Sequence, residues 1–246
     1  MVGQGVVFIA LTACGRIGFD PGADTDGGVL GGKTAPITDR LTAETTCEPG
    51  PSQLILDREA PTGATLLVAF FMREPAATTL PVISGGATTW ATDVSFSSFD
   101  STNRRHISIF HAPVEAPIPA GTMIAIDHPM AISTGAAAFI IPSRVLATGG
   151  APATAEGRVG AFTGSLTTIG SGVLCALVHH NRSDASFDVP FAQVYSLQSD
   201  CGGTRGSAGL HLAIAQGPGP MTCAGTLGPT LSWVSAMVAY DQPPLP

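Results

Sequence analysis

The sequence predicts an all-β protein: an antiparallel β-sandwich of the jelly-roll type, with about ten strands, after a disordered N-terminal tether. Three observations predict this fold. Charged residues make up only 12% of the 246 residues, about half the share of an average soluble domain. Gly (30) and Pro (20) are frequent, as turns between many short strands require. The apolar runs after residue 51 are short and lack a helical period.

The first thirteen residues have the features of a secretory leader. An apolar run from Val6 to Leu11 continues directly into the small residues Thr12 and Ala13, which precede Cys14. LTAC resembles the lipobox of bacterial lipoproteins, and the following GRIGFDPGADTDGG resembles the segment after the lipobox in predicted lipoproteins of myxobacteria and their relatives. The resemblance implies cleavage after residue 13 and acylation of Cys14. The alternative is that Cys14 is a buried residue of a first strand.

The resemblance also implies a location. No Asp follows Cys14 directly, and in Gram-negative lipoproteins this implies export to the outer membrane. The acylated Cys14 would then attach the chain to a membrane, with the folded part periplasmic or exposed at the surface. No later segment approaches the about 18 uninterrupted apolar residues that a membrane-spanning helix needs.

Residues 14–50 are predicted to form a flexible tether, because Gly, Asp, Thr and Pro dominate the segment. Within it, GGVLGGKT at 27–34 fits the phosphate-binding pattern GxxxxGK[ST]. Such a loop needs a buried strand before it and a helix after it, whereas DPGADTD precedes it and Pro36 follows. The motif is therefore interpreted as linker, and no nucleotide is expected to bind. The net charge of −7 likewise argues against nucleic acid as a partner.

Residues 51–242 are predicted to form the sandwich, and 243–246 a C-terminal tail. Some runs alternate between apolar and polar residues, as in Ile107-Ser108-Ile109, and others are continuously apolar, as in Leu66 to Phe71. Continuous runs predict strands that are covered on both faces. The predicted strands are 65–72, 80–84, 88–96, 106–111, 122–127, 136–141, 160–167, 172–179, 191–197, 209–216 and 231–240.

Several of these segments resemble, in order, a β-sandwich that recurs in bacterial surface and secreted proteins. They are GATLLVAFFM, GGATTWATDV, HISIFHAPV, AAAFIIPSRV, GSLTTIGSGVLCALVHH and LSWVSAMVAYD. The resemblance covers residues 62–241 and implies an extracellular display module without an assigned activity. Carbohydrate-binding sandwiches share this architecture, but a fold alone does not confer the function.

Four cysteines remain besides Cys14: Cys47, Cys175, Cys201 and Cys223. An even number outside the cytosol predicts two disulfides, and three pairings are open. The predicted strand 209–216 separates Cys201 from Cys223 by more than about 20 Å along its length, which disfavours that pair. Cys175 lies within an apolar strand, where a buried thiol is the ordinary expectation.

The histidines and the acidic residues are the candidate metal ligands. His179 and His180 form the densest cluster, but adjacent strand residues point to opposite faces and cannot easily share one ion, so no metal site is expected. The acidic residues near turns could form a rim that holds Ca²⁺, although turn acids usually cap the backbone. These acidic residues are Asp93, Asp100, Asp127, Asp184 and Asp188.

The sequence therefore favours a non-enzymatic, lipid-anchored display module of the cell envelope, for adhesion, glycan contact or envelope structure. No catalytic residue and no cofactor is assigned. The first alternative is a carbohydrate-binding module with Trp90, His179 or His180 in the ligand platform, while core packing is the competing role for Trp90 and Trp233. The second alternative is a secreted hydrolase that uses His179 or His180.

Overall fold

Among the residues that the computed structural model describes, every regular element is a β-strand and every strand pairing is antiparallel. The predicted all-β antiparallel sandwich is thereby confirmed. The described residues are 39–47, 50–74, 80–86, 88–99, 104–128, 133–147, 152–158, 161–168, 172–180, 184–201, 207–216, 219–228 and 232–241.

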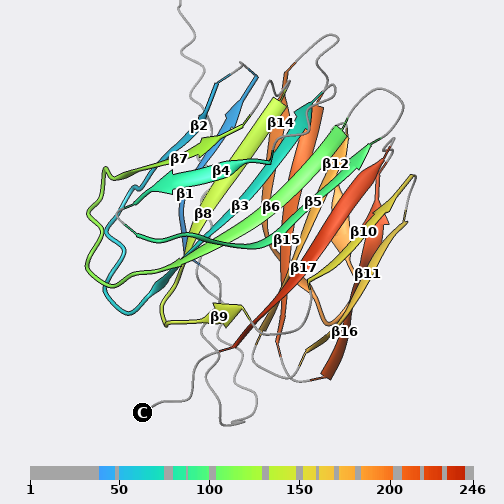
Figure 1. Cartoon of the computed structure of the whole chain (residues 1–246). Helices are drawn as coiled ribbons and strands as arrows, with labels where there is room; N and C mark the ends of the chain where they lie inside the picture. The colour runs from blue at the N-terminus through green and yellow to red at the C-terminus, as the bar shows by residue number, and fades with distance from the viewer. Residues whose placement is uncertain are drawn as a thin grey trace, which may run out of the picture. The chain divides into compact units, whose positions relative to one another are not determined.

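The first half of the described chain forms two sheets (Figure 1). Its strands are β1 (Asp39–Thr46), β2 (Ser52–Ile55), β3 (Thr65–Glu74), β4 (Val82–Gly85), β5 (Ala91–Phe99), β6 (Arg104–Pro113), β7 (Met123–Asp127) and β8 (Ser133–Ile141). The five-stranded sheet has the order β1-β8-β3-β6-β5, and the three-stranded sheet has the order β2-β7-β4.

The second half also forms two sheets. Its strands are β9 (Leu146–Ala147), β10 (Ala153–Gly157), β11 (Ala161–Thr168), β12 (Gly172–His180), β13 (Ala185–Phe187), β14 (Ala192–Asp200), β15 (Ser207–Gln216), β16 (Gly219–Leu227) and β17 (Trp233–Asp241). One sheet has the order β10-β17-β12-β15-β14, with β9 paired to β17, and the other has the order β11-β16-β13.

The two halves repeat the same topology. If the strands β1 to β8 and β10 to β17 are each counted from one to eight, both large sheets read 1-8-3-6-5 and both small sheets read 2-7-4. This connectivity is jelly-roll-like: consecutive strands alternate between two packed sheets, except that the fifth and sixth strands of each half are neighbours in the large sheet. The predicted jelly-roll-like fold is therefore present twice, and this repeat was not predicted from the sequence.

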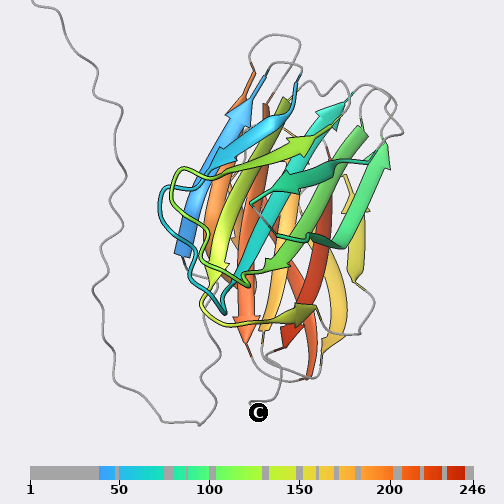
Figure 2. The ribbon, with the colours of Figure 1, turned by 60° about the vertical axis from the view of Figure 1, so that its left-hand side comes forward.

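The four sheets stack as layers, with the two large sheets, of five and six strands, in the middle (Figures 1 and 2). A central apolar cluster joins these two sheets, with Leu67 and Phe71 on one side and Leu212 and Val238 on the other. Each large sheet also packs against its own three-stranded sheet through one further cluster. The repeat thus packs face to face through its larger sheets, and the burial of apolar area between them stabilises the pair.

The stack explains the continuously apolar runs. In β3, Leu67 and Phe71 face the central cluster, whereas Leu66, Val68 and Phe70 face the cluster under β2 and β7. Successive side chains of a strand point to opposite faces, so a strand in an inner layer needs apolar residues at every position. The prediction that this run is covered on both faces is confirmed.

The boundary between tether and sandwich was predicted too far along the chain. Residues 39–46, assigned to the tether, form β1 and pair with β8, from Asp39 opposite Ile140 to Thr46 opposite Thr134. The segment has one large buried apolar residue, Leu41, so its composition resembles a linker. Pairing with β8 orders it nevertheless. Cys14, the GGVLGGKT motif and the C-terminal tail lie outside the described residues.

Candidate functional site

The strongest cluster of acid–base groups in the described chain is formed by Asp93, His111 and Tyr240. The His111 ring nitrogen Nδ1 lies 2.5 Å from the Asp93 oxygen Oδ1, and the Tyr240 hydroxyl donates a hydrogen bond of 2.5 Å to Oδ2. The Asp93 side chain is only 2% exposed and that of His111 is 14% exposed. The three residues come from β5, β6 and β17, so the cluster joins the two halves of the repeat.

A β-bulge positions Asp93. The register between β5 and β6 shifts between Thr92 and Val94, so Asp93 is an additional residue with no direct partner on β6. A bulge redirects a side chain and commonly occurs beside functional residues. Here it directs a carboxylate towards His111, which pairs with Ala91 on β5.

The Asp93 carboxylate orients both of its partners. Asp93 accepts a hydrogen bond at each of its oxygens, so it holds Nδ1 of His111 as the protonated nitrogen. Burial and the Asp93 charge raise the pKa of Tyr240 well above its ordinary value, which keeps its hydroxyl a donor. An oriented imidazole of this kind is suited to proton transfer or to ligand binding through Nε2.

Sequence reasoning placed Asp93 among the turn acids and did not connect it with His111 or Tyr240. The available signal was a carboxylate inside an otherwise apolar and hydroxyl-bearing strand, TTWATDVSF. The partners could not be found, because Tyr240 lies 147 residues from Asp93 along the chain.

His179 and His180 point to opposite faces, as predicted. His179 lies on the outer face of β12, where its Nε2 is 2.8 Å from Nε2 of His211. His180 faces the central layer, where its Nδ1 is 3.4 Å from Nη2 of Arg105. Both side chains are buried, so in this conformation neither provides the open ring face that a ligand platform requires.

His106 lies in a buried group of serine hydroxyls. Its Nδ1 is 2.6 Å from Oγ of Ser97 and its Nε2 is 2.6 Å from Oγ of Ser108. Burial, with a smaller contribution from the Arg104 charge, lowers the pKa of His106 to about 3. The ring is therefore neutral at neutral pH and is a weak base, so the pair with Ser97 lacks the basicity that activates a serine nucleophile.

The two tryptophans differ in exposure. Trp233 is 5% exposed and packs in the cluster under the β11-β16-β13 sheet, which is the predicted core role. Trp90 is half-buried against the cluster under the β2-β7-β4 sheet, and its indole N–H donates to the Gly85 carbonyl at 2.9 Å. Of the two, Trp90 alone retains exposed ring surface.

The predicted acidic rim is not assembled. Asp93 is buried in the interior, and Asp127 ends β7 in the first half. Asp184 and Asp188 flank β13 in the second half, and Asp100 lies outside the described residues. Within the described ranges no group of three or more His, Cys, Asp or Glu side chains is arranged to hold a metal ion.

The four cysteines of the sandwich form two disulfides, Cys47–Cys201 and Cys175–Cys223. The expectation of a buried thiol at Cys175 was wrong: its side chain points from β12 towards the outer sheet, where β16 presents Cys223. The two disulfides indicate an oxidising, extracytoplasmic location. Among the residues described, no helix is long and apolar enough to cross a bilayer.

The fold and the cross-links together define a class: a disulfide-stabilised, all-β tandem jelly roll. Comparison with protein-family models, with curated proteins and with solved structures found no match to this chain.

Proposed function

We propose that this chain is a lipid-anchored display module of the cell envelope, attached through Cys14, with a role in adhesion, glycan contact or envelope structure. The supporting observation is how its cysteines are divided between disulfides and the lipobox-like motif. The chain has five, and four of them are joined in pairs in the sandwich. The fifth is Cys14, which stands in the lipobox-like LTAC. Cross-links in the body and an acyl-acceptor cysteine near the start fit an exported lipoprotein.

Cys14→Ser tests the anchor. The wild-type protein should fractionate with membranes and release an N-terminal peptide whose mass includes an acylated cysteine, as measured by mass spectrometry. The variant should lose that modification and leave the outer-membrane fraction. Cys47→Ser is the control, because it alters a cysteine of the sandwich and should leave the acylation of Cys14 unchanged. An unmodified N-terminus on the wild-type protein in the cytosol would refute the proposal.

A carbohydrate-binding module is the second candidate, and the partly exposed Trp90 is the observation that favours it. The bond from its indole N–H to Gly85 fixes the ring, and a fixed aromatic face can stack on a sugar with little loss of entropy. Glycan-array binding should then disappear in Trp90→Ala and persist in Trp90→Phe. Equal binding by Trp90→Ala and the wild type would exclude this platform.

A further inference from the structure

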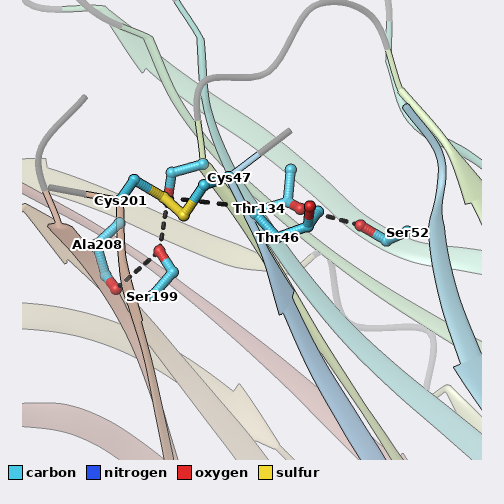
Figure 3. The surroundings of a disulfide bond; sticks show 8 residues. Thr46, Cys47, Ser52, Thr134, Ser199, Cys201 and Ala208 are labelled. Carbon is cyan, nitrogen blue, oxygen red and sulfur yellow. Dashed lines mark hydrogen bonds between the residues drawn. A yellow bond between two sulfur atoms is a disulfide. The ribbon is translucent and has the colours of Figure 1, made fainter. Parts of the chain in front are cut away.

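The disulfide Cys47–Cys201 joins two edge strands that belong to different halves of the repeat (Figure 3). Cys47 directly follows β1, and Cys201 directly follows β14. β1 is an edge of the first large sheet and pairs with β8, whereas β14 is an edge of the second large sheet and pairs with β15. The bond therefore connects the two central layers at their margins.

Among the side chains of β1 that the structure describes, at positions 40–46, one is fully buried. It is Leu41, and Ala43 is partly buried against the central cluster. β1 also makes two polar contacts. The Arg40 guanidinium lies 5.7 Å from the centre of the Tyr195 ring, and the Gln53 amide donates a hydrogen bond of 2.7 Å to Glu44. Contacts of this exposed kind contribute little to stability.

The neighbour of β1 in the sheet, β8, is by contrast fully buried. Every residue of β8 from Ser133 to Ile141 is buried, and β8 pairs with β1 on one side and β3 on the other. If β1 left the sheet, the backbone N–H and C=O groups of β8 that face it would lose their partners. An apolar strand with such an exposed edge is open to pairing with another extended chain.

The two disulfides also differ in access to solvent. Cys175 and Cys223 are fully buried between β12 and β16. Cys47 and Cys201 are partly exposed at the end of the sandwich, beside Ser199 (Figure 3). Thiol–disulfide exchange requires a thiolate to reach a sulfur atom, so the exposed bond should react first.

We propose that Cys47–Cys201 is a redox-sensitive lock that keeps β1 on β8, and that a dithiol reductant opens it while Cys175–Cys223 stays closed. One thiolate of the reductant attacks a sulfur of the pair, which forms a mixed disulfide and expels the other cysteine as a thiolate. The second thiol of the reductant then displaces the remaining cysteine. Overall, two electrons and two protons pass from the dithiol to the pair, which yields two cysteine thiols and an oxidised reductant.

Opening the lock leaves β1 dependent on its own contacts. β1 should then detach from β8 locally, while the central cluster between the halves stays packed, because that cluster is built mainly from residues of the inner strands. The structure thus assigns to reduction a defined product: a folded sandwich with the edge of β8 exposed.

The test uses the purified, oxidised full-length chain under graded dithiothreitol without denaturant. Differential alkylation and mass spectrometry should show Cys47 and Cys201 labelled about tenfold or more faster than Cys175 and Cys223. Hydrogen exchange at the amides of residues 39–46 should accelerate about tenfold or more, while β12 and β17 remain protected.

The Cys47→Ser/Cys201→Ser variant provides an independent measurement. Without reductant, its β1 amides should exchange as fast as those of the reduced wild type, and adding dithiothreitol should cause no further change in β1. Equal labelling of both disulfides would overturn the proposal. So would unchanged protection of β1 after selective reduction, or a loss of protection in β12 and β17 together with β1.

Discussion

At the scale of single residues, His106 shows how burial sets a charge state that the sequence does not reveal. The sequence places it in an alternating strand, where a histidine on the polar face would be solvated. The structure instead encloses it among Ser95, Ser97 and Ser108. Hydroxyl groups can donate to or accept from a neutral ring, so they satisfy both nitrogens without a charge. The uncharged form is therefore the one that the fold accommodates.

The lowered pKa of His106 predicts that the folded chain loses stability in acid. The pKa of His106 is about 3 in the folded chain and about 6.5 when unfolded, so the unfolded state binds the extra proton between these pH values. The contribution of His106 to stability is complete above pH 6.5 and declines towards pH 3, by up to about 1.4 kcal/mol per pH unit. Urea unfolding of His106→Asn at pH 7.5, 5.5 and 4.5 should show a shallower decline than the wild type. Parallel declines would contradict this account.

At the scale of the elements, close approach between neighbouring strands explains a glycine near the start of β8. A Cβ atom added to Gly135 would lie 2.3 Å from Cε1 of Phe71, a residue of the central cluster. Phe71 occupies the space above Gly135 because the two are directly paired on β3 and β8. The Phe71 ring therefore fits because Gly135 has no side chain.

Gly135→Ala should therefore destabilise the fold by about 1–3 kcal/mol, since Phe71 must move within a packed core. Gly172→Ala is the control. That glycine lies in β12, and the nearest neighbour of an added Cβ is the Ala215 carbonyl oxygen at an ordinary 3.8 Å. Chemical denaturation should show a clear loss for the first variant and little change for the second. Similar losses in both would show that strand propensity, rather than the Phe71 contact, is responsible.

The strands that could be predicted from the sequence are those with a clear apolar or alternating pattern. All eleven predicted strands are present, because each has several large apolar or alternating residues. Six strands of the described chain were not predicted: β1, β2, β9, β10, β13 and β16. β1 and β10 have little apolar character of their own, and pairing with β8 and β17 orders them. β16 does alternate, with Met221, Cys223 and Leu227 buried, but its Pro and Gly residues resemble a turn.

Contacts between residues far apart in the sequence could not be predicted, either for the disulfides or for the Asp93 cluster. Neither the connection of Cys47 to Cys201 nor that of Cys175 to Cys223 leaves a local pattern, and three pairings fitted the cysteine count. The Asp93 cluster depends on a bulge, and a bulge changes which face one residue occupies. What could be predicted was the existence of two disulfides, and the opposite orientation of His179 and His180.

At the scale of the whole molecule, the shared central cluster predicts that both halves unfold together. Each half has one tryptophan, Trp90 in the first and Trp233 in the second, so Trp90→Phe and Trp233→Phe each leave one half to report by fluorescence. Leu212 in the second half packs in the central cluster, and Leu212→Ala should cost about 2–5 kcal/mol.

In the Leu212→Ala background, the denaturation midpoints reported by Trp90 and by Trp233 should fall by the same amount. A truncation confined to an outer cluster, Leu54→Ala under the β2-β7-β4 sheet, serves as the comparison and should also move both midpoints if unfolding is cooperative. Two separate transitions would mean that the jelly rolls are independent units joined by a weak contact.

The tandem repeat gives the molecule two outward-facing surfaces that need not remain alike. On the β2-β7-β4 sheet, Ile55 (56%), Val82 (62%) and Met123 (48%) are exposed to solvent. On the corresponding β11-β16-β13 sheet, the exposed residues include Thr222, Thr226 and Ser186. A body that uses one topology twice can thus carry different residues on its two outer sheets, so a single copy can present two chemically distinct sides to its surroundings.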